Sequence, residues 1–416
     1  METLSPVILA IPVYFTLMAI ELVIEKFSKH HTYRVDDAIT NISTGVLQQL
    51  TGTFVKIVKL GVYAFVFEQF AWYVIPVNAW SFALLFVLWD LCYYWEHRVA
   101  HRVSLFWGGH SVHHQSEVYN LSVALRQSST SFLWGFPFYL PLALIGFDPV
   151  QVLLAGGFNL LYQFWIHTEH ISKLPRLLEW VLNTPSHHRV HHGRDPKYLD
   201  KNFAGVFIVW DRLFNTFQEE EERPNYGVTK PLRSWNPVYA NVAHYVDLFG
   251  YLGKARSLGD GLRILFKPPG WLPDYLGGVS EVPVVADDYQ KYEVRLSLPM
   301  KGYVLAQFLF ALLVNAWYFF NFEGLDMPVQ LFFAGWIMLT TLAFGFLFEQ
   351  QGRKWLFGIE GIRLLALPVG YVVLQIPAAG LLPFLSVFAV LSVVVFLLLQ
   401  RSISPRKATD SAPSYR

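Results

Sequence analysis

The chain has 416 residues, of which 54% are hydrophobic, 17% aromatic and only 15% charged, so its apolar share exceeds that of an ordinary soluble domain. Its formal net charge is +1, and without an excess of basic residues to neutralise a phosphate backbone no nucleic-acid partner is expected. The single cysteine, Cys92, excludes an internal disulfide and a thiolate metal cluster, which leaves nitrogen and oxygen as metal ligands.

Apolar segments near the ~20 residues needed to cross hydrocarbon recur along the chain and predict an all-α integral membrane protein. They lie at about 4–24, 80–95, 302–322, 328–348, 355–376 and 380–400. The first has neither a basic start nor a small-residue cleavage site, so we expect a retained span instead of a signal peptide. The stretch 46–77 is apolar but carries three charged residues, and we count it as one span.

Between these spans, residues 131–147 and 149–166 are apolar and flank a turn at Asp148-Pro149. This pattern predicts a tight helical hairpin whose short arms cross only part of the membrane.

The distribution of Lys and Arg predicts the orientation. With the amino terminus outside, the basic residues fall on one side, in 25–45, 96–129, 167–300, 349–354 and the tail. The opposite loops, such as "NFEGLDMP" and "IPAAG", contain none, so every histidine is placed on the cytosolic face of a bacterial inner membrane or the endoplasmic reticulum. The expected divisions are N-terminal spans (1–79), a histidine-rich core with a cytosolic cap (80–300), four C-terminal membrane helices (301–400) and a basic cytosolic tail (401–416).

Eleven of the 14 histidines lie between residues 97 and 192, in the pieces "HRVAH", "HSVHH", "HTEH" and "HHRVHH". Spacings of three and four place these rings on one face of a helix, and imidazole binds iron, zinc, copper and nickel. Because one ion takes about three to six ligands, this many converging histidines suit a dinuclear metal site. The candidate ligands are His97, His101, His110, His113, His114, His167, His170, His188, His191 and His192.

The remaining histidines have weaker patterns. His187 is the spare ring of its motif, and we place it beside the metals instead of on them. His30, His31 and His244 lack neighbouring histidines and are expected at the interface or the surface.

Polar residues on the helices that lead to these motifs are candidates to support the ligands. Asp90 lies on one helical stripe with His97 and His101, and Asn159 and Gln163 precede His167 on a similar stripe. They either orient ligands or pack helices through interhelical hydrogen bonds. Since no carboxylate stands at ligand spacing inside the motifs, a site that uses O2 on a lipid fits better than a hydrolytic one.

The series HxxxH, HxxHH, HxxHH resembles the fatty acid hydroxylase and sterol desaturase superfamily of membrane di-iron enzymes. The stretches at 109–128, 160–170, 183–217 and 266–273, the third being "NTPSHHRVHHGRDPKYLDKNFAGVFIVWDRLFNTF", are similar to its ether-lipid-cleaving members. The resemblance implies two Fe ions, tetrahydrobiopterin as electron donor, and a monooxygenase acting on the alkyl carbon next to an ether oxygen. The resulting hemiacetal would break down to a fatty aldehyde and a glycerol derivative.

The resemblance also assigns residues. It matches the HxxxH and HxxHH histidines and His167 to family ligands, whereas His170 stands where it implies an apolar residue in animal members. Glu117, Tyr119 and Asn120 retain the "SExYN" pattern and are candidates for a substrate or pterin pocket, with loop capping as the alternative. Arg102 replaces an implied glutamate, which leaves another electron donor open.

Two other functions remain open at this point. A sterol or fatty-acid hydroxylase or desaturase would use the same di-iron site on a different lipid. A metal-binding membrane transporter or sensor would have no catalytic activity. Against this function, the histidines are not spread along a path across the bilayer. The sequence makes no prediction of oligomeric state.

Overall fold

The fold is taken from a computed structural model, which describes residues 9–28, 31–349, 353, 355–376 and 381–401. In these residues the secondary structure is helical apart from two isolated β-bridges, which confirms the predicted all-α class. The chain forms two compact units. Unit 1 comprises Met1–Arg233 and Val238–Tyr292, and unit 2 comprises Ser234–Pro237 and Glu293–Arg416.

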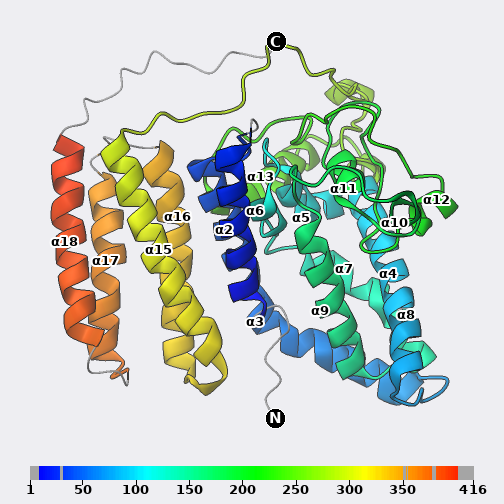
Figure 1. The fold of residues 1–416 in the computed structure, drawn as a ribbon, viewed down its shortest axis with the longest axis horizontal. Coiled ribbons are helices and arrows are strands. Elements are labelled where there is room, and N and C mark those ends of the chain that lie inside the picture. The colour runs from blue at the N-terminus through cyan, green and yellow to red at the C-terminus, as the bar shows by residue number, and fades with distance from the viewer. Residues whose placement is uncertain (1–8, 29–30, 350–352, 354, 377–380, 402–416) are drawn as a thin grey trace. The chain divides into compact units, whose positions relative to one another are not determined.

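Unit 1 combines long helices with short helices and loops (Figure 1). Its longer helices are α2 (Ile11–Phe27), α3 (Val35–Phe70), α4 (Ala79–Arg102), α5 (Ser104–His114), α9 (Pro149–Trp165), α13 (Pro237–Leu252) and α14 (Leu258–Phe266). Its short helices are α6 (Leu121–Ala124), α7 (Phe132–Gly135), η1 (Phe136–Tyr139), α8 (Leu140–Ile145), α10 (Arg176–Val181), α11 (Pro185–His191), α12 (Val209–Leu213) and η2 (Asp274–Leu276). Several of the short helices and loops, such as α10, α11 and α12, gather at one end (Figure 1).

The predicted hairpin is present, with a first arm divided into α7, η1 and α8. Prolines at the starts of η1 and α8 account for the division, because proline has no N–H for a continuous helix. At the turn, Gly146 has a φ of +109°, and the Asp148 carboxylate accepts from the first N–H groups of α9. The loop between α3 and α4 lies against this turn, since Trp72 and Ile75 donate to main-chain carbonyls of Leu144 and Gly146.

A hydrophobic core joins α3, α4, α8 and α9 near this turn. Tyr63, Leu85, Trp89 and Phe147 are buried together there. Gly156 of α9 faces the Trp89 ring, where an added Cβ would lie 2.8 Å from a ring carbon, so glycine permits the close approach of α4 and α9. The two helices are thereby fixed with their C-terminal ends at the same end of unit 1.

In its described residues, unit 2 contains four long helices and one short one: α15 (Leu298–Asn321), η3 (Phe322–Gly324), α16 (Met327–Glu349), α17 (Trp355–Val373) and α18 (Leu381–Arg401). A polar cluster lies inside this unit. Arg363 and Glu360 of α17 form an ion pair and are almost fully buried, and Arg363 also donates to the Gln307 side chain at 2.7 Å. Because these two charges are paired with each other within the unit, the helices can present apolar surfaces outward.

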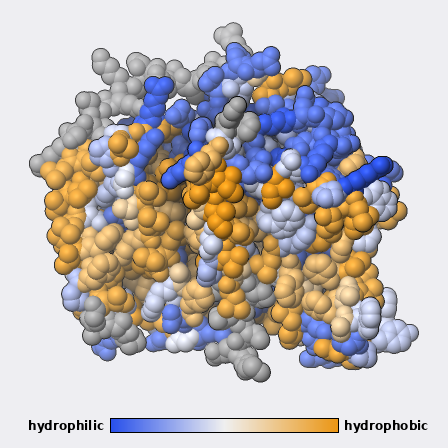
Figure 2. Space-filling model, in the orientation of Figure 1, coloured by the Kyte–Doolittle hydropathy of each residue, from blue (hydrophilic) through white to orange (hydrophobic). Residues whose placement is uncertain are grey.

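Five helical segments in the described residues are long and apolar enough to cross a membrane, as in an integral membrane protein. They are α3, α15 with η3, α16, α17 and α18. The stretch predicted at 46–77 thus contains one span candidate, as counted, but the helix begins at Val35 and ends at Phe70, and residues 71–77 belong to the loop before α4. Figure 2 shows apolar side chains over the long helices of each unit and hydrophilic ones gathered over the short helices and loops of unit 1.

Two predicted spans, 4–24 and 80–95, are not among the five. The described part of the first is α2, 17 residues long, and its Glu21 and Glu25 are buried against polar partners of the protein. In α4, Asp90 and Glu96 interrupt the apolar stretch. Residues 4–8 and the predicted tail from 402 lie outside the described residues.

Candidate metal centre

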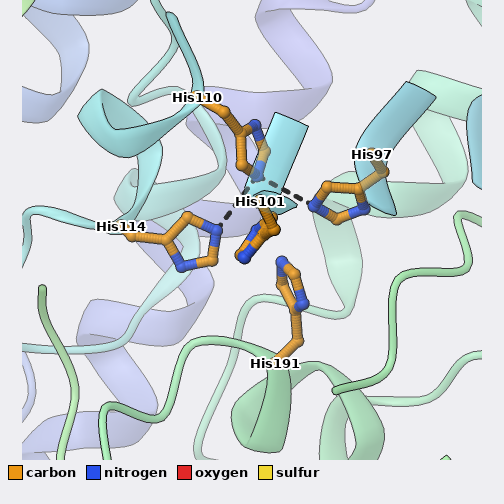
Figure 3. A group of neighbouring side chains, drawn as sticks. All are labelled: His97, His101, His110, His114 and His191. Atoms are coloured by element: carbon orange, nitrogen blue, oxygen red, sulfur yellow. Dashed lines mark hydrogen bonds between the residues drawn. The ribbon is translucent and has the colours of Figure 1, made fainter. Parts of the chain in front are cut away.

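Nine of the ten predicted ligands come together in two groups inside unit 1. The five-histidine group comprises His97, His101, His110, His114 and His191, and its rings point toward one another (Figure 3). The four-histidine group comprises His113, His167, His188 and His192. In each group the possible ligand atoms all lie within 4.8 Å of one another, so each can hold one metal ion.

The local structure explains how the motifs reach these positions. The first two histidines sit on the last turns of α4, and Val103 separates that helix from α5, which carries the next three. His167 directly follows α9. The last three lie on or just after α11, which begins with Pro185 after the cap residue Thr184. Helices from distant parts of the sequence thus place their ends around one site.

Main-chain carbonyls fix the orientation of four rings from outside the site. The pairs are His97 Nδ1 with the oxygen of Phe203 (2.6 Å), His113 with Arg126 (2.9 Å), His167 with Gln163 (2.7 Å) and His191 with Lys201 (2.9 Å). A carbonyl oxygen can only accept, so each Nδ1 carries the hydrogen. In a neutral imidazole the inward Nε2 is then a free lone pair, the form that binds a metal.

The inward atoms lack the partners that such lone pairs require. Nε2 of His113 and His167 face each other at 3.3 Å, although the Nδ1 atoms of both rings already carry the hydrogens. Two lone pairs at this distance repel unless a cation lies between them. In addition, Nε2 atoms of His101, His191 and His192 are buried without a hydrogen-bond partner. Nitrogen atoms whose lone pairs have no hydrogen-bond partner are the atoms that bind a metal, so this arrangement fits two metal ions, one in each group.

Burial also favours the neutral state of the rings. Desolvation lowers the pKa of His113 to about 4, and it lowers the pKa values of other ligand candidates well below that of free histidine. These are His110, His114, His167, His188, His191 and His192, several of which also repel one another's charged forms. At neutral pH the rings are therefore uncharged and available to a metal without first losing a proton.

Asp200 is a carboxylate at the site that the sequence patterns did not reveal. Its Oδ1 lies 3.3 Å from His101 Nδ1, and its Oδ2 lies 3.4 Å from a guanidinium nitrogen of Arg102. Arg102, which stands where the resemblance implies a glutamate, thus holds Asp200, and Asp200 orients His101. No spacing rule could have identified Asp200, because it lies 99 residues from His101.

Asp90, Asn159 and Gln163, the polar residues expected near the ligands, hold main-chain segments that in turn orient ligand rings. Asp90 is fully buried and accepts hydrogen bonds from the backbone of Val206 and Phe207, three and four residues after the carbonyl that holds His97. Asn159 donates to Asp90 at 2.7 Å and accepts from Gln163 at 2.6 Å. Gln163 itself supplies the main-chain oxygen for His167. Their side chains do not hydrogen-bond to a ligand ring in the described contacts.

Other histidines lie apart from the two groups. His170 belongs to neither, and its Nε2 is buried without a hydrogen-bond partner. His187 points away, since its Nε2 lies 3.0 Å from Glu179. The His31 side chain is 80% exposed, whereas His244 is half-buried and its Nε2 hydrogen-bonds to the main-chain oxygen of Ser104. His30 lies outside the described residues.

The "SExYN" residues have different surroundings. Tyr119 is buried, with its ring stacked on those of His167 and Tyr226. Glu117 accepts from the backbone of Tyr292 and is 3.6 Å from Arg194, so it fastens a distant loop. Asn120 caps α6. Tyr119 alone of the three contacts a candidate ligand ring in the described contacts.

Comparisons with known proteins agree with this geometry. A family model described as fatty acid hydroxylase matches residues 82–216, which include both groups. The chain is 39% identical to human alkylglycerol monooxygenase and 38% identical to that of Xenopus tropicalis, over 83% and 85% of its own length and 78% and 79% of theirs. It is 26% identical to mouse lathosterol oxidase over 31% of its length and 42% of that protein. No solved structure matches the chain.

Proposed function

Because this chain belongs to the alkylglycerol monooxygenase family, we propose that it oxidises the alkyl carbon next to the ether bond of alkylglycerol lipids. One oxygen atom of O2 enters that C–H bond, and the other leaves as water after uptake of two electrons and two protons. The hemiacetal then collapses to a fatty aldehyde and a glycerol derivative. The observation that carries this proposal is the pair of buried histidine groups, in which the inward nitrogens face one another and three of them have no hydrogen-bond partner among the described residues.

The nine grouped histidines are the proposed ligands of two iron ions. Iron bound there would supply the chemistry that activates O2. The protein's own contribution is to keep the imidazoles neutral by burial and to aim them through outward hydrogen bonds. We include His170 only as an additional ligand that would require its ring to move, since it belongs to neither group.

For the electron donor we propose a tetrahydropterin, as the resemblance of the motifs implies. Tetrahydrobiopterin can release two electrons and two protons as it becomes a dihydropterin, which balances the reaction above. Arg102 does not exclude this donor, because Asp200 places a carboxylate beside His101 from another part of the chain.

The purified full-length protein is expected to contain two irons per chain and to release fatty aldehyde from an alkylglycerol when O2 and tetrahydrobiopterin are supplied. Metal analysis and aldehyde detection measure both. Iron without aldehyde would favour the sterol or fatty-acid alternative, to which the short match with lathosterol oxidase gives distant support. If the folded protein, supplied with metal, contained no iron and had no activity, both oxygenase functions would be excluded and the transporter or sensor function would remain.

We further propose that the histidine end faces the cytosol, because the Lys and Arg residues lie in loops on that side of the predicted topology. The test replaces Cys92 with serine and introduces one cysteine at the exposed Glu221. In bacterial spheroplasts, an impermeant maleimide is expected to label this cysteine only after the membrane is opened. Labelling of intact spheroplasts would reverse the orientation.

A further inference from the structure

Unit 1 contains a cavity of about 430 Å³ along a stripe of α5 next to the one that carries the ligand histidines. The helix has two stripes. Ser104, Trp107, Ser111 and Gln115, spaced three or four residues apart, line the cavity, whereas the HxxHH histidines face the two ligand groups. Residues of α13 and the loops at 228–232 and 269–283 form the other walls. The volume lies within the range of small-molecule sites, roughly 300–1,000 Å³.

Trp107 separates this cavity from the five-histidine group. Its indole lines the cavity, and its ring centre lies 4.9 Å from that of His101 and 5.5 Å from that of His114. A molecule resting against the indole would therefore be one aromatic ring away from two proposed iron ligands.

The walls combine apolar side chains with several polar groups. Glu281 offers carboxylate oxygens, Asp247 offers a carboxylate that is paired with Lys230 at 2.6 Å, and Trp271 offers a ring face. An alkyl chain would cover these polar groups without replacing their hydrogen bonds to water, which costs free energy. Ser111 adds a specific requirement, because its buried hydroxyl in the cavity wall has no hydrogen-bond partner. The walls therefore suit a small, flat molecule with several N–H groups.

We propose that this cavity binds the electron donor of the oxygenase, a flat, N–H-rich heterocycle that releases two electrons and two protons by converting a C–N single bond into C=N. This inference rests on the proposed function, since such a reaction needs two electrons and two protons for each O2. The cavity places the donor beside Trp107, apart from the lipid. Donor and lipid therefore occupy different sites.

The test uses tetrahydrobiopterin as the probe and the iron-loaded full-length protein under anaerobic conditions, with binding measured by calorimetry. Ala243→Trp fills the cavity from α13, and Val246→Trp is its matched control on the exposed face of the same helix. We expect at least tenfold weaker binding and a higher KM for the pterin in Ala243→Trp, with iron content unchanged. Val246→Trp should bind like the wild type.

A second, gentler variant guards against misfolding of the first. Ser111→Ala should weaken pterin binding about threefold to tenfold, the loss expected for one hydrogen bond, without changing the melting temperature. Unchanged binding in both variants, or competitive displacement of the pterin by alkylglycerol, would overturn the cavity assignment. Ether cleavage with another donor and no pterin binding would overturn it while the proposed function stands. Pterin binding without ether cleavage would contradict the proposed function instead.

Discussion

Replacing His113 or His191 with alanine is expected to abolish ether cleavage and lower the iron content from two per chain to one or fewer. The two residues belong to different groups, and each inward Nε2 is set by an outward bond from Nδ1 to a main-chain carbonyl. Removing either ring deletes one ligand from its group, and the remaining rings cannot take the place of that ligand. Metal analysis and aldehyde release on the same preparation measure both effects.

His31→Ala is the matched control, because its side chain is 80% exposed and lies in neither group. It should keep both iron and activity. If either ligand variant retained full iron and normal turnover, the assignment of its group as a metal site would be wrong. Loss of one iron in His113→Ala and of the other in His191→Ala would establish that the two groups bind separate ions.

Asp90→Ala is expected to lower the free energy of unfolding by about 4 kcal/mol or more, because four donors lose a buried acceptor at about 1–3 kcal/mol each. The donors are the backbone N–H groups of Val206 and Phe207, the indole of Trp210 and the amide of Asn159. These donors anchor the segment around Gly205 close to α4. An added Cβ at Gly205 would lie 2.7 Å from an oxygen of Asp90. Thermal melting of the detergent-solubilised protein measures the loss.

The same variant should retain less iron, since the anchored segment carries the carbonyl of Phe203 that orients His97. Asp287→Ala, which removes an exposed carboxyl, should change neither the melting temperature nor the iron content. A melting temperature equal to that of the wild type would mean that Asp90 does not hold this segment.

The histidine pattern predicted more of the site than any other feature of the sequence. Spacings of three and four identify which rings share a helical face, and nine of the ten candidates do meet. Spacing could not divide them between groups: His113 and His114 are adjacent in sequence yet belong to different groups. Nor could it show that His170 lies outside both groups, because "HTEH" has a ligand-like spacing whether or not the chain turns after α9.

The fold was predictable where one local signal sufficed. Asp148-Pro149 marked the hairpin because both residues favour the start of a helix. Helix α4 is not among the five span candidates, and its Asp90 and Glu96 are held by protein partners that only the tertiary structure supplies. The cavity beside Trp107 was invisible for the same reason, since its walls come from segments more than a hundred residues apart.

The outward bonds of four ligand rings end on backbone oxygens, which every amino acid possesses. Residues 126, 163, 201 and 203 can therefore be exchanged in evolution or in a mutational scan without removing the atom that sets the protonation of a ligand. We expect the side chains there to tolerate change wherever packing permits, while small shifts of the backbone do not. At these positions selection acts on the path of the backbone. The protonation of a metal ligand can therefore be set by a main-chain oxygen that no sequence motif identifies.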